Sequence, residues 1–167
     1  DLFDDLVVGT ITVGINPNSI VSDKYGKVWV LCGGSTGPDF IGGTADDIAG
    51  SLWCINPNTY VIEKQFIMNA ANHPVKMKIN GDKTELWYLL GDDGYSGNIV
   101  KMGISAPAPN NNPVINKIFY GLGIDAENGN IHGGYSPGFT QNGFMFRYTS
   151  AGVLIDSMGV GIAPNGF

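Results

Sequence analysis

The chain ends on nearly the phrase with which its first repeat begins. "VGINPNSI" starts at Val13 and "VGIAPNGF" starts at Val160, 147 residues later. Internal repeats of the blade type recur about every 40 to 50 residues, so this distance accommodates three such units. The two phrases therefore mark the same structural joint three units apart, and the chain is predicted to consist of repeated equivalent units.

Three interior segments share one plan: an apolar strand that ends in Asp or Asn, a short polar turn, and a second strand. They are residues 19–31, 75–90 and 121–134. At the turns, Asp23, Asn80 and Asp125 can accept hydrogen bonds from their own backbone two residues further on, while Gly26 and Gly129 supply backbone angles that other residues avoid. Each segment is predicted to be a tight hairpin.

A second hairpin follows each of these segments. The second hairpins are residues 51–67, 97–119 and 144–160. Four short antiparallel strands per repeat are typical of a β-propeller blade. We therefore predict an all-β fold, a β-propeller with about three four-stranded antiparallel blades plus flanking strands. The blades cover about residues 16–67, 74–119 and 121–160, with residues 6–13 as the outer strand of a preceding blade and residues 162–167 as a closing inner strand.

Three blades are too few for a closed ring, since propellers usually have about four to eight. Either the chain belongs to a longer one whose ring has about seven blades, or copies of it assemble to complete the ring. We expect the first arrangement, because an open sheet edge is an aggregation hazard. An open β-sandwich of about a dozen strands is the alternative fold.

Charge and composition exclude some functions. The net charge is −6 and no cluster of Lys and Arg occurs, so the basic footprint of a nucleic-acid-binding protein is missing. The longest apolar runs fall short of the roughly 20 residues of a membrane-spanning helix. Cys32 and Cys54 lie in what are predicted to be neighbouring strands. They are either a disulfide or two buried thiols, and they lack the spacing of a redox or zinc motif.

Several of these phrases resemble one protein family. They are "NPNSIVSDKYGKVWVLCGG", "GSLWCINPNTYVIEKQF", "YGLGIDAENGNI" and the closing "RYTSAGVLIDSMGVGIAPNGF". In them the sequence resembles YncE-like, YVTN-type β-propellers, particularly surface lipoproteins of Gram-negative gut anaerobes. The closing run looks like the C-terminus of such proteins, where the last strand completes the first blade. The insert at residues 33–50 departs from the commoner pattern.

The resemblance implies binding rather than catalysis, with no cofactor. It implies a location at the cell surface, anchored to the outer membrane or periplasmic, as an accessory to TonB-dependent nutrient uptake. The expected partners are a small molecule, cobalamin-like or a glycan, an outer-membrane transporter, and further blades from the same longer chain or from another copy. Two alternatives remain open: a propeller enzyme of lactonase or quinoprotein type, and a structural module for assembly.

The predicted strand order places the longest loops on one face. They are residues 33–50, 91–97 and 133–142, and they converge with the joints between blades at residues 16–19 and 69–74. Long loops on a rigid scaffold are where function concentrates, and aromatics beside polar groups suit a ligand. The candidate ligand-binding residues are Asp39, Phe40, Asn72, His73, Asp92, Asp93, Tyr95, Tyr135 and Phe139.

No catalytic or metal-binding constellation is evident. The acidic pairs Asp46/Asp47 and Asp92/Asp93 could contribute ligands to Ca²⁺, but they match no calcium-binding loop. His73 and His132 are far apart in the sequence and have no nearby nucleophile, so we interpret them as structural. The chain has no GxSxG elbow for serine hydrolysis. Its three Trp residues lie in predicted strands, where inter-blade packing is their expected role.

Overall fold

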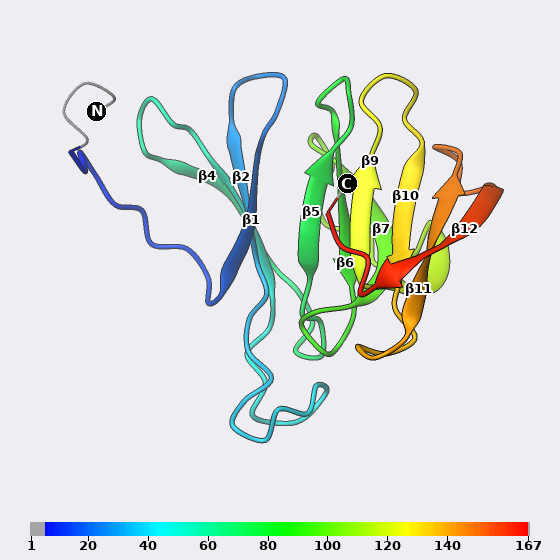
Figure 1. The fold of residues 1–167 in the computed structure, drawn as a ribbon. Helices are drawn as coiled ribbons and strands as arrows, with labels where there is room; N and C mark the ends of the chain where they lie inside the picture. The colour runs from blue at the N-terminus through cyan, green and yellow to red at the C-terminus, as the bar shows by residue number, and fades with distance from the viewer. Residues whose placement is uncertain (1–5, 167) are drawn as a thin grey trace.

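The computed structural model describes residues 6–166, which form twelve strands and no helix. The strands make three four-stranded antiparallel sheets (Figure 1). The first sheet consists of β1 (Pro17–Ser22), β2 (Val28–Cys32), β3 (Ser51–Ile55) and β4 (Ile62–Ile67). The second consists of β5 (Val75–Ile79), β6 (Glu85–Leu90), β7 (Gly97–Gly103) and β8 (Ile115–Phe119). The third consists of β9 (Gly121–Ile124), β10 (Ile131–Tyr135), β11 (Asn142–Tyr148) and β12 (Leu154–Ile162).

Within each sheet the strands pair in chain order, and the innermost strand of the second sheet, β5, contacts β1 on one side and β9 on the other. The outer strands β4, β8 and β12 end the three sheets, which lie side by side in Figure 1. This arrangement confirms the predicted all-β fold of propeller blades. The sheets are called the first, second and third blade below.

The hairpin turns use the residues that the sequence singles out. In the first blade, Asp23 Oδ1 accepts hydrogen bonds from the backbone N–H groups of Tyr25 and Lys27, at 2.8 and 3.0 Å. Asn80 and Asp125 accept hydrogen bonds from backbone N–H groups of their own turns in the same way. Local side-chain acceptors of this kind hold a tight turn without help from distant residues.

Two hydrophobic cores lie between the blades. The buried residues of the first core are Trp29, Leu31, Leu52, Cys54, Met68, Met77, Leu86, Tyr88, Leu90, Val100, Met102 and Ile104. Those of the second are Val75, Trp87, Leu89, Ile99, Ile115, Phe119, Leu122, Ile131 and Tyr148. Because successive residues of a strand point to opposite faces, β6 contributes alternate residues to both cores. This explains why "ELWYLL" is apolar without alternating with polar residues.

Two of the three Trp residues lie in the inter-blade cores, and the third does not. Trp29 and Trp87 pack in the two inter-blade cores, as predicted. Trp53 is half-buried, and its neighbours Leu52 and Cys54 both pack in the first core. The Trp53 ring therefore lies on the face of the first blade that is turned away from the second blade. There its Nε1 donates a hydrogen bond to Ser51 Oγ at 2.8 Å.

The two cysteines are free, buried thiols, so of the two alternatives open at the sequence level the disulfide is not formed. Burial raises the pKa of the Cys32 thiol, and burial followed by the nearby Asp23 carboxylate raises the pKa of Cys54 to about 11. A thiol with a raised pKa is a poor nucleophile. Both residues act as small apolar groups of the packing.

The flanking segments contain no strand in the structure. Residues 6–13, predicted to be an outer strand, lie in no strand of the structure, and Val7 and Val8 are exposed. The partners of such a strand would belong to a preceding blade. Residues 163–166, within the predicted closing strand, also lie in no strand, and Phe167 falls outside the described residues. Between residues 6 and 166 no helix is long and apolar enough to cross a membrane.

Candidate functional site

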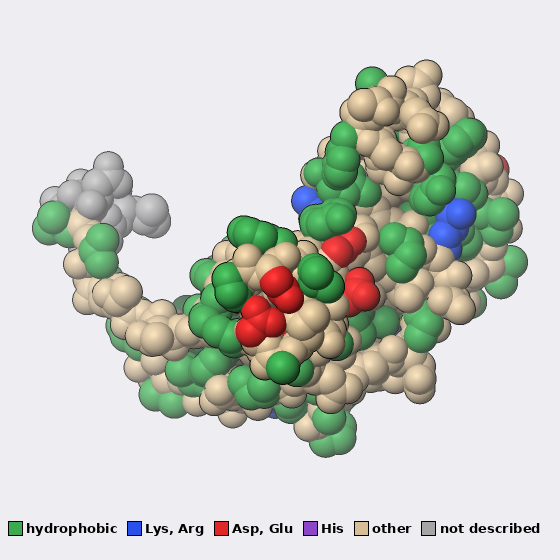
Figure 2. All heavy atoms as spheres, turned by 90° about the horizontal axis from the view of Figure 1, so that it is seen from below, with side chains coloured by type: hydrophobic (Ala, Val, Ile, Leu, Met, Phe, Trp, Pro, Cys, Tyr) green, Lys and Arg blue, Asp and Glu red, His purple; other side chains and the backbone are tan. Residues whose placement is uncertain are grey.

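The long loops lie together on one face of the molecule. The β2–β3, β6–β7 and β10–β11 loops emerge at the lower edge in Figure 1, and the short hairpin turns lie at the upper edge. Figure 2 looks onto the lower face, where acidic side chains gather near the centre and hydrophobic side chains border them. The predicted order of the strands therefore accounts for the one-sided distribution of loops.

Three neighbouring clefts on this face share lining residues, and we call them together the loop-face groove. Its first section, of about 360 Å³, lies between the β2–β3 loop, His73 and Asp93. The central section, of about 220 Å³, shares Asn16 and Gly94 with the first. The third section, of about 110 Å³, shares Tyr95 and Tyr120 with the central one and reaches the β10–β11 loop. The groove therefore runs across all three blades.

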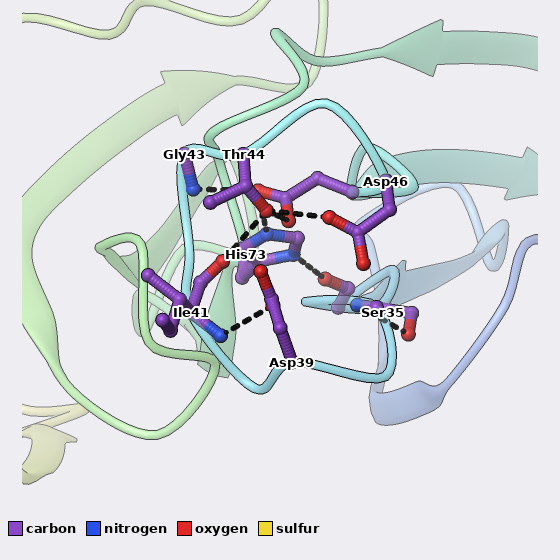
Figure 3. Close-up of polar contacts among 10 residues, drawn as sticks. Ser35, Asp39, Ile41, Gly43, Thr44, Asp46 and His73 are labelled. Atoms are coloured by element: carbon purple, nitrogen blue, oxygen red, sulfur yellow. Dashed lines mark hydrogen bonds and ion pairs between the residues drawn. The ribbon is translucent and has the colours of Figure 1, made fainter.

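A buried ion pair anchors the β2–β3 loop beside the first section (Figure 3). The His73 side chain is 1% exposed, and its Nδ1 lies 2.9 Å from the Gly33 carbonyl oxygen. Its Nε2 lies 3.1 Å from Oδ2 of Asp47, whose side chain is 0% exposed. The Gly33 carbonyl oxygen and Asp47 Oδ2 thus both face ring nitrogens of His73, and the ring connects the two ends of the β2–β3 loop.

The same loop supplies further donors to the Asp47 carboxylate. The Gly43 N–H donates to Asp47 Oδ2 at 2.6 Å, and the Thr44 hydroxyl lies 2.7 Å from Asp46 Oδ1 and 3.2 Å from Asp47 Oδ1. Burial tends to raise the pKa of Asp47, but hydrogen bonds from His73, Gly43 and Thr44 outweigh it and hold that pKa below its ordinary value. The loop is therefore closed around an ionised carboxylate.

The β2–β3 loop also packs against the β6–β7 loop. A Cβ added at Gly42 would lie 1.7 Å from the Asp92 carbonyl oxygen, so only glycine fits this close approach. The wall of the first section is consequently built from two loops in direct contact.

Five of the nine residues predicted to bind a ligand line the groove. They are Phe40, His73 and Asp93 in the first section, Tyr95 in the central and third sections, and Phe139 in the third. The Phe139 ring stands edge-on to the Tyr120 ring, with centroids 5.4 Å apart. Asp93 lines the wall but is engaged in its own turn, because Oδ1 accepts hydrogen bonds from the Tyr95 and Ser96 N–H groups.

The other four candidates do not line the groove. Asp39 Oδ1 accepts a hydrogen bond from the N–H of Ile41 at 2.8 Å. Asp92 contributes its backbone to the contact with the β2–β3 loop, and the carbonyl of Asn72 accepts a hydrogen bond from Gly50. The Tyr135 ring packs against the second core, 6.4 Å from the Phe146 ring and 4.5 Å from the ammonium group of Lys117.

Sequence reasoning missed Asn16, Lys76 and Tyr120, which line the central section. Asn16 and Lys76 have left-handed backbones, with φ of 56° and 60°. Lys76 sits where the β5–β6 pairing shifts register between Val75 and Lys78. The alternation in "VKMKI" predicts an ordinary strand there, so the sequence carries no signal for this bulge. The place of Tyr120, directly between the second and third blades, was the available clue.

No group of three or more His, Cys, Asp or Glu side chains that could hold a metal ion occurs within residues 6–166. The two acidic pairs considered as calcium ligands are both part of loop structure. Asp46 and Asp47 are near the Thr44 hydroxyl, and Asp93 closes the β6–β7 turn. Asp46, Asp47 and Asp93 are thus engaged in hydrogen bonds within their own loops.

No protein-family profile matches the chain, and no curated protein matches it significantly. Among solved structures, it is similar to a protein from Bacteroides thetaiotaomicron described as quinonprotein alcohol dehydrogenase-like, with a TM-score of 0.62 and 14% sequence identity. The match covers 85% of this chain and 33% of that one. At such identity the likeness shows the fold alone. The chain has the fold of propeller blades and spans a third of the length of the structure that it matches.

Proposed function

We propose that this chain is part of a non-catalytic β-propeller that binds a small ligand in the loop-face groove. The observation that carries the proposal is that three neighbouring clefts share lining residues on the face that bears the long loops. The three sections of the groove extend over three blades, while the long loops of those blades form its walls. A concave site lined by apolar and aromatic side chains with a few fixed polar groups is the usual form of a ligand site.

Exposed aromatic side chains support this use of the groove. Phe40, Tyr95 and Phe139 are 85%, 54% and 61% exposed, although each borders a section of the groove. Large aromatic rings bury much apolar area when a ligand covers them. Polar neighbours such as Asn16 would orient that ligand. A corrin or a glycan, both of which combine apolar faces with polar edges, fits this lining.

The family resemblance extends the proposal to location and partners. We place the protein at the cell surface or in the periplasm, where it would deliver its ligand to an outer-membrane transporter. The groove is open along its length, which suits a site that takes up a ligand and releases it to a partner. The proposed location and partners rest on the sequence phrases that resemble YncE-like propellers and on the gathering of the long loops on one face.

Ligand binding is tested by calorimetric titration with cyanocobalamin and with a panel of neutral oligosaccharides. We expect Tyr95→Ala and Phe139→Ala each to weaken binding about tenfold, since removing a buried aromatic contact costs on the order of 1 to 3 kcal/mol. Tyr25→Ala is the matched control, because Tyr25 is also an exposed aromatic residue but lies in the β1–β2 turn on the opposite face. Binding that survives both groove substitutions would place the site elsewhere.

An enzyme is the alternative that the name of the similar structure raises. A propeller enzyme of lactonase or quinoprotein type would draw part of its active site from blades beyond these three. Elemental analysis and the absorption spectrum of the protein purified from its source test directly whether it carries a metal ion or a quinone. One metal ion or one quinone per chain would contradict the non-catalytic proposal.

A further inference from the structure

The central section of the groove contains a lysine in an unusual backbone conformation. Lys76 has a φ of 60°, in the left-handed region that favours Gly and Asn. The register shift beside it is a bulge, and its two neighbours point to opposite sides as a result: Val75 packs in the second core and Met77 in the first. Bulges re-aim side chains and occur often next to functional sites.

Packing explains the bulge, but it does not explain a lysine. A glycine or asparagine would adopt this conformation at lower cost, since a left-handed backbone is strained for other residues. The side chain that stands there carries a positive charge in a protein of net charge −6.

The Lys76 ammonium group has no carboxylate partner among residues 6–166. It makes a cation–π contact with the Tyr120 ring, whose centroid lies 5.6 Å from Nζ. The ion pairs of the described chain engage Lys27, Lys101, Arg147 and His73 instead. Asp93, an acidic residue of the adjoining section, is held in its own turn.

Two other hydrogen-bonding side chains of the central section are also unengaged. The Asn16 amide and the Tyr95 hydroxyl make no hydrogen bond within the described chain, whereas Asn18 donates to the Pro74 carbonyl at 3.0 Å. An ammonium, an amide and a phenol thus line one cleft of about 220 Å³ beside the Tyr120 ring. All three can donate hydrogen bonds to oxygen, and together they match an anionic group attached to a flat apolar body.

We propose that the central section of the loop-face groove is an anion subsite, in which Lys76 binds a carboxylate or phosphate group of the ligand while the Tyr95 and Tyr120 rings contact its apolar part. The inference rests on the proposed binding function and narrows its ligand to an anionic one. An uncharged glycan would leave Lys76 without a counter-charge.

The test uses two probes of the same shape, benzoate and benzyl alcohol, which differ in charge. Each is titrated into the ¹⁵N-labelled chain while the amide signals of Asn16, Gly94 and Tyr95 are followed. The unmodified chain is expected to bind benzoate about tenfold more tightly than benzyl alcohol, as a charge-assisted hydrogen bond predicts. Added salt should weaken the binding of benzoate alone.

Three substitutions complete the experiment. Lys76→Gln and Lys76→Asn should each weaken benzoate binding about tenfold and leave benzyl alcohol binding unchanged. Asn suits the left-handed backbone, so Lys76→Asn keeps the test valid if the Gln variant folds poorly. Lys78 lies on the same strand but outside the cleft, so Lys78→Gln should leave the binding of both benzoate and benzyl alcohol unchanged.

The outcomes separate this inference from the proposed function. If benzyl alcohol shifts the groove amides and benzoate binds no more tightly, the anion subsite is wrong and the groove remains a binding site. If Lys76→Gln leaves benzoate binding unchanged, the assignment of Lys76 is wrong. If neither probe shifts these amides, both proposals fail.

Discussion

At the scale of single residues, the blades can be compared position by position. In the first blade, the Nε1 of Trp29 donates a hydrogen bond to Asp23 Oδ2 at 2.9 Å, inside the core. Trp87 holds the corresponding place in the second blade, and its buried Nε1 has no partner. The equivalent turn residue is Asn80, whose side-chain oxygen accepts two backbone N–H groups of its turn. The second blade thus has Asn80 where the first has Asp23, and the buried N–H of Trp87 is left without an acceptor.

Asn80→Asp should therefore stabilise the fold. The carboxylate keeps one oxygen for the turn and offers the other to Trp87, so we expect the free energy of unfolding to rise by about 1 kcal/mol. Urea unfolding followed by tryptophan fluorescence measures it. The reverse exchange, Asp23→Asn, should lower stability by a similar amount in the first blade. A loss of stability in Asn80→Asp would show that the turn cannot present its second oxygen to the indole.

At the scale of elements, the strands and turns follow from local chemistry and were predictable, because alternating apolar residues and acceptor residues at turns act over short distances. The bulge in β5 was not. Val75 and Met77 read as two residues of one face, and only their separate burial in two cores shows the shift. The closure of the β2–β3 loop was equally hidden, since His73 and Asp47 are 26 residues apart and nothing in their local patterns links them.

The β2–β3 loop is expected to depend on pH through Asp47. The folded-state pKa of this carboxyl is lowered, so its stabilising effect is complete above the ordinary Asp pKa of about 3.9 and is lost as the pH falls through the folded value. Hydrogen exchange of residues 33–50 should quicken accordingly on acidification, after correction for the intrinsic rate. Asp47→Asn should open the loop at neutral pH and flatten this dependence. Asp46→Asn serves as control, and equal behaviour of the two variants would refute the anchoring role.

At the scale of the whole molecule, the first core covers one face of the first blade, and the second core covers one face of the third blade. The opposite face of the first blade includes Ile20, 69% exposed, which lines a shallow hollow with Val30. In the middle blade, both faces are covered, as the burial of β6 shows. The repeat predicts this difference, because each unit can complete its core only against a neighbour.

We therefore expect the isolated 167-residue chain to associate with itself as its concentration rises, and a longer chain with further blades to remain monomeric. Sedimentation velocity measures both. Ile20→Lys should weaken the association because it places a charge on the apolar face, whereas Ile48→Lys, in the β2–β3 loop, should leave it unchanged. A monomeric chain at all concentrations would show that the face of the first blade needs no cover.

A ligand bound in the groove would also hold the blades together. Its central section takes Asn16 from the entry to β1, Lys76 from β5 and Tyr120 from the junction of β8 and β9, so one occupant would span both seams between neighbouring sheets. Prising any two blades apart would then require breaking its contacts as well as the packing of the core. A bound ligand would therefore make the blades harder to separate, and the resistance of the blades to separation would report directly on whether a ligand is bound.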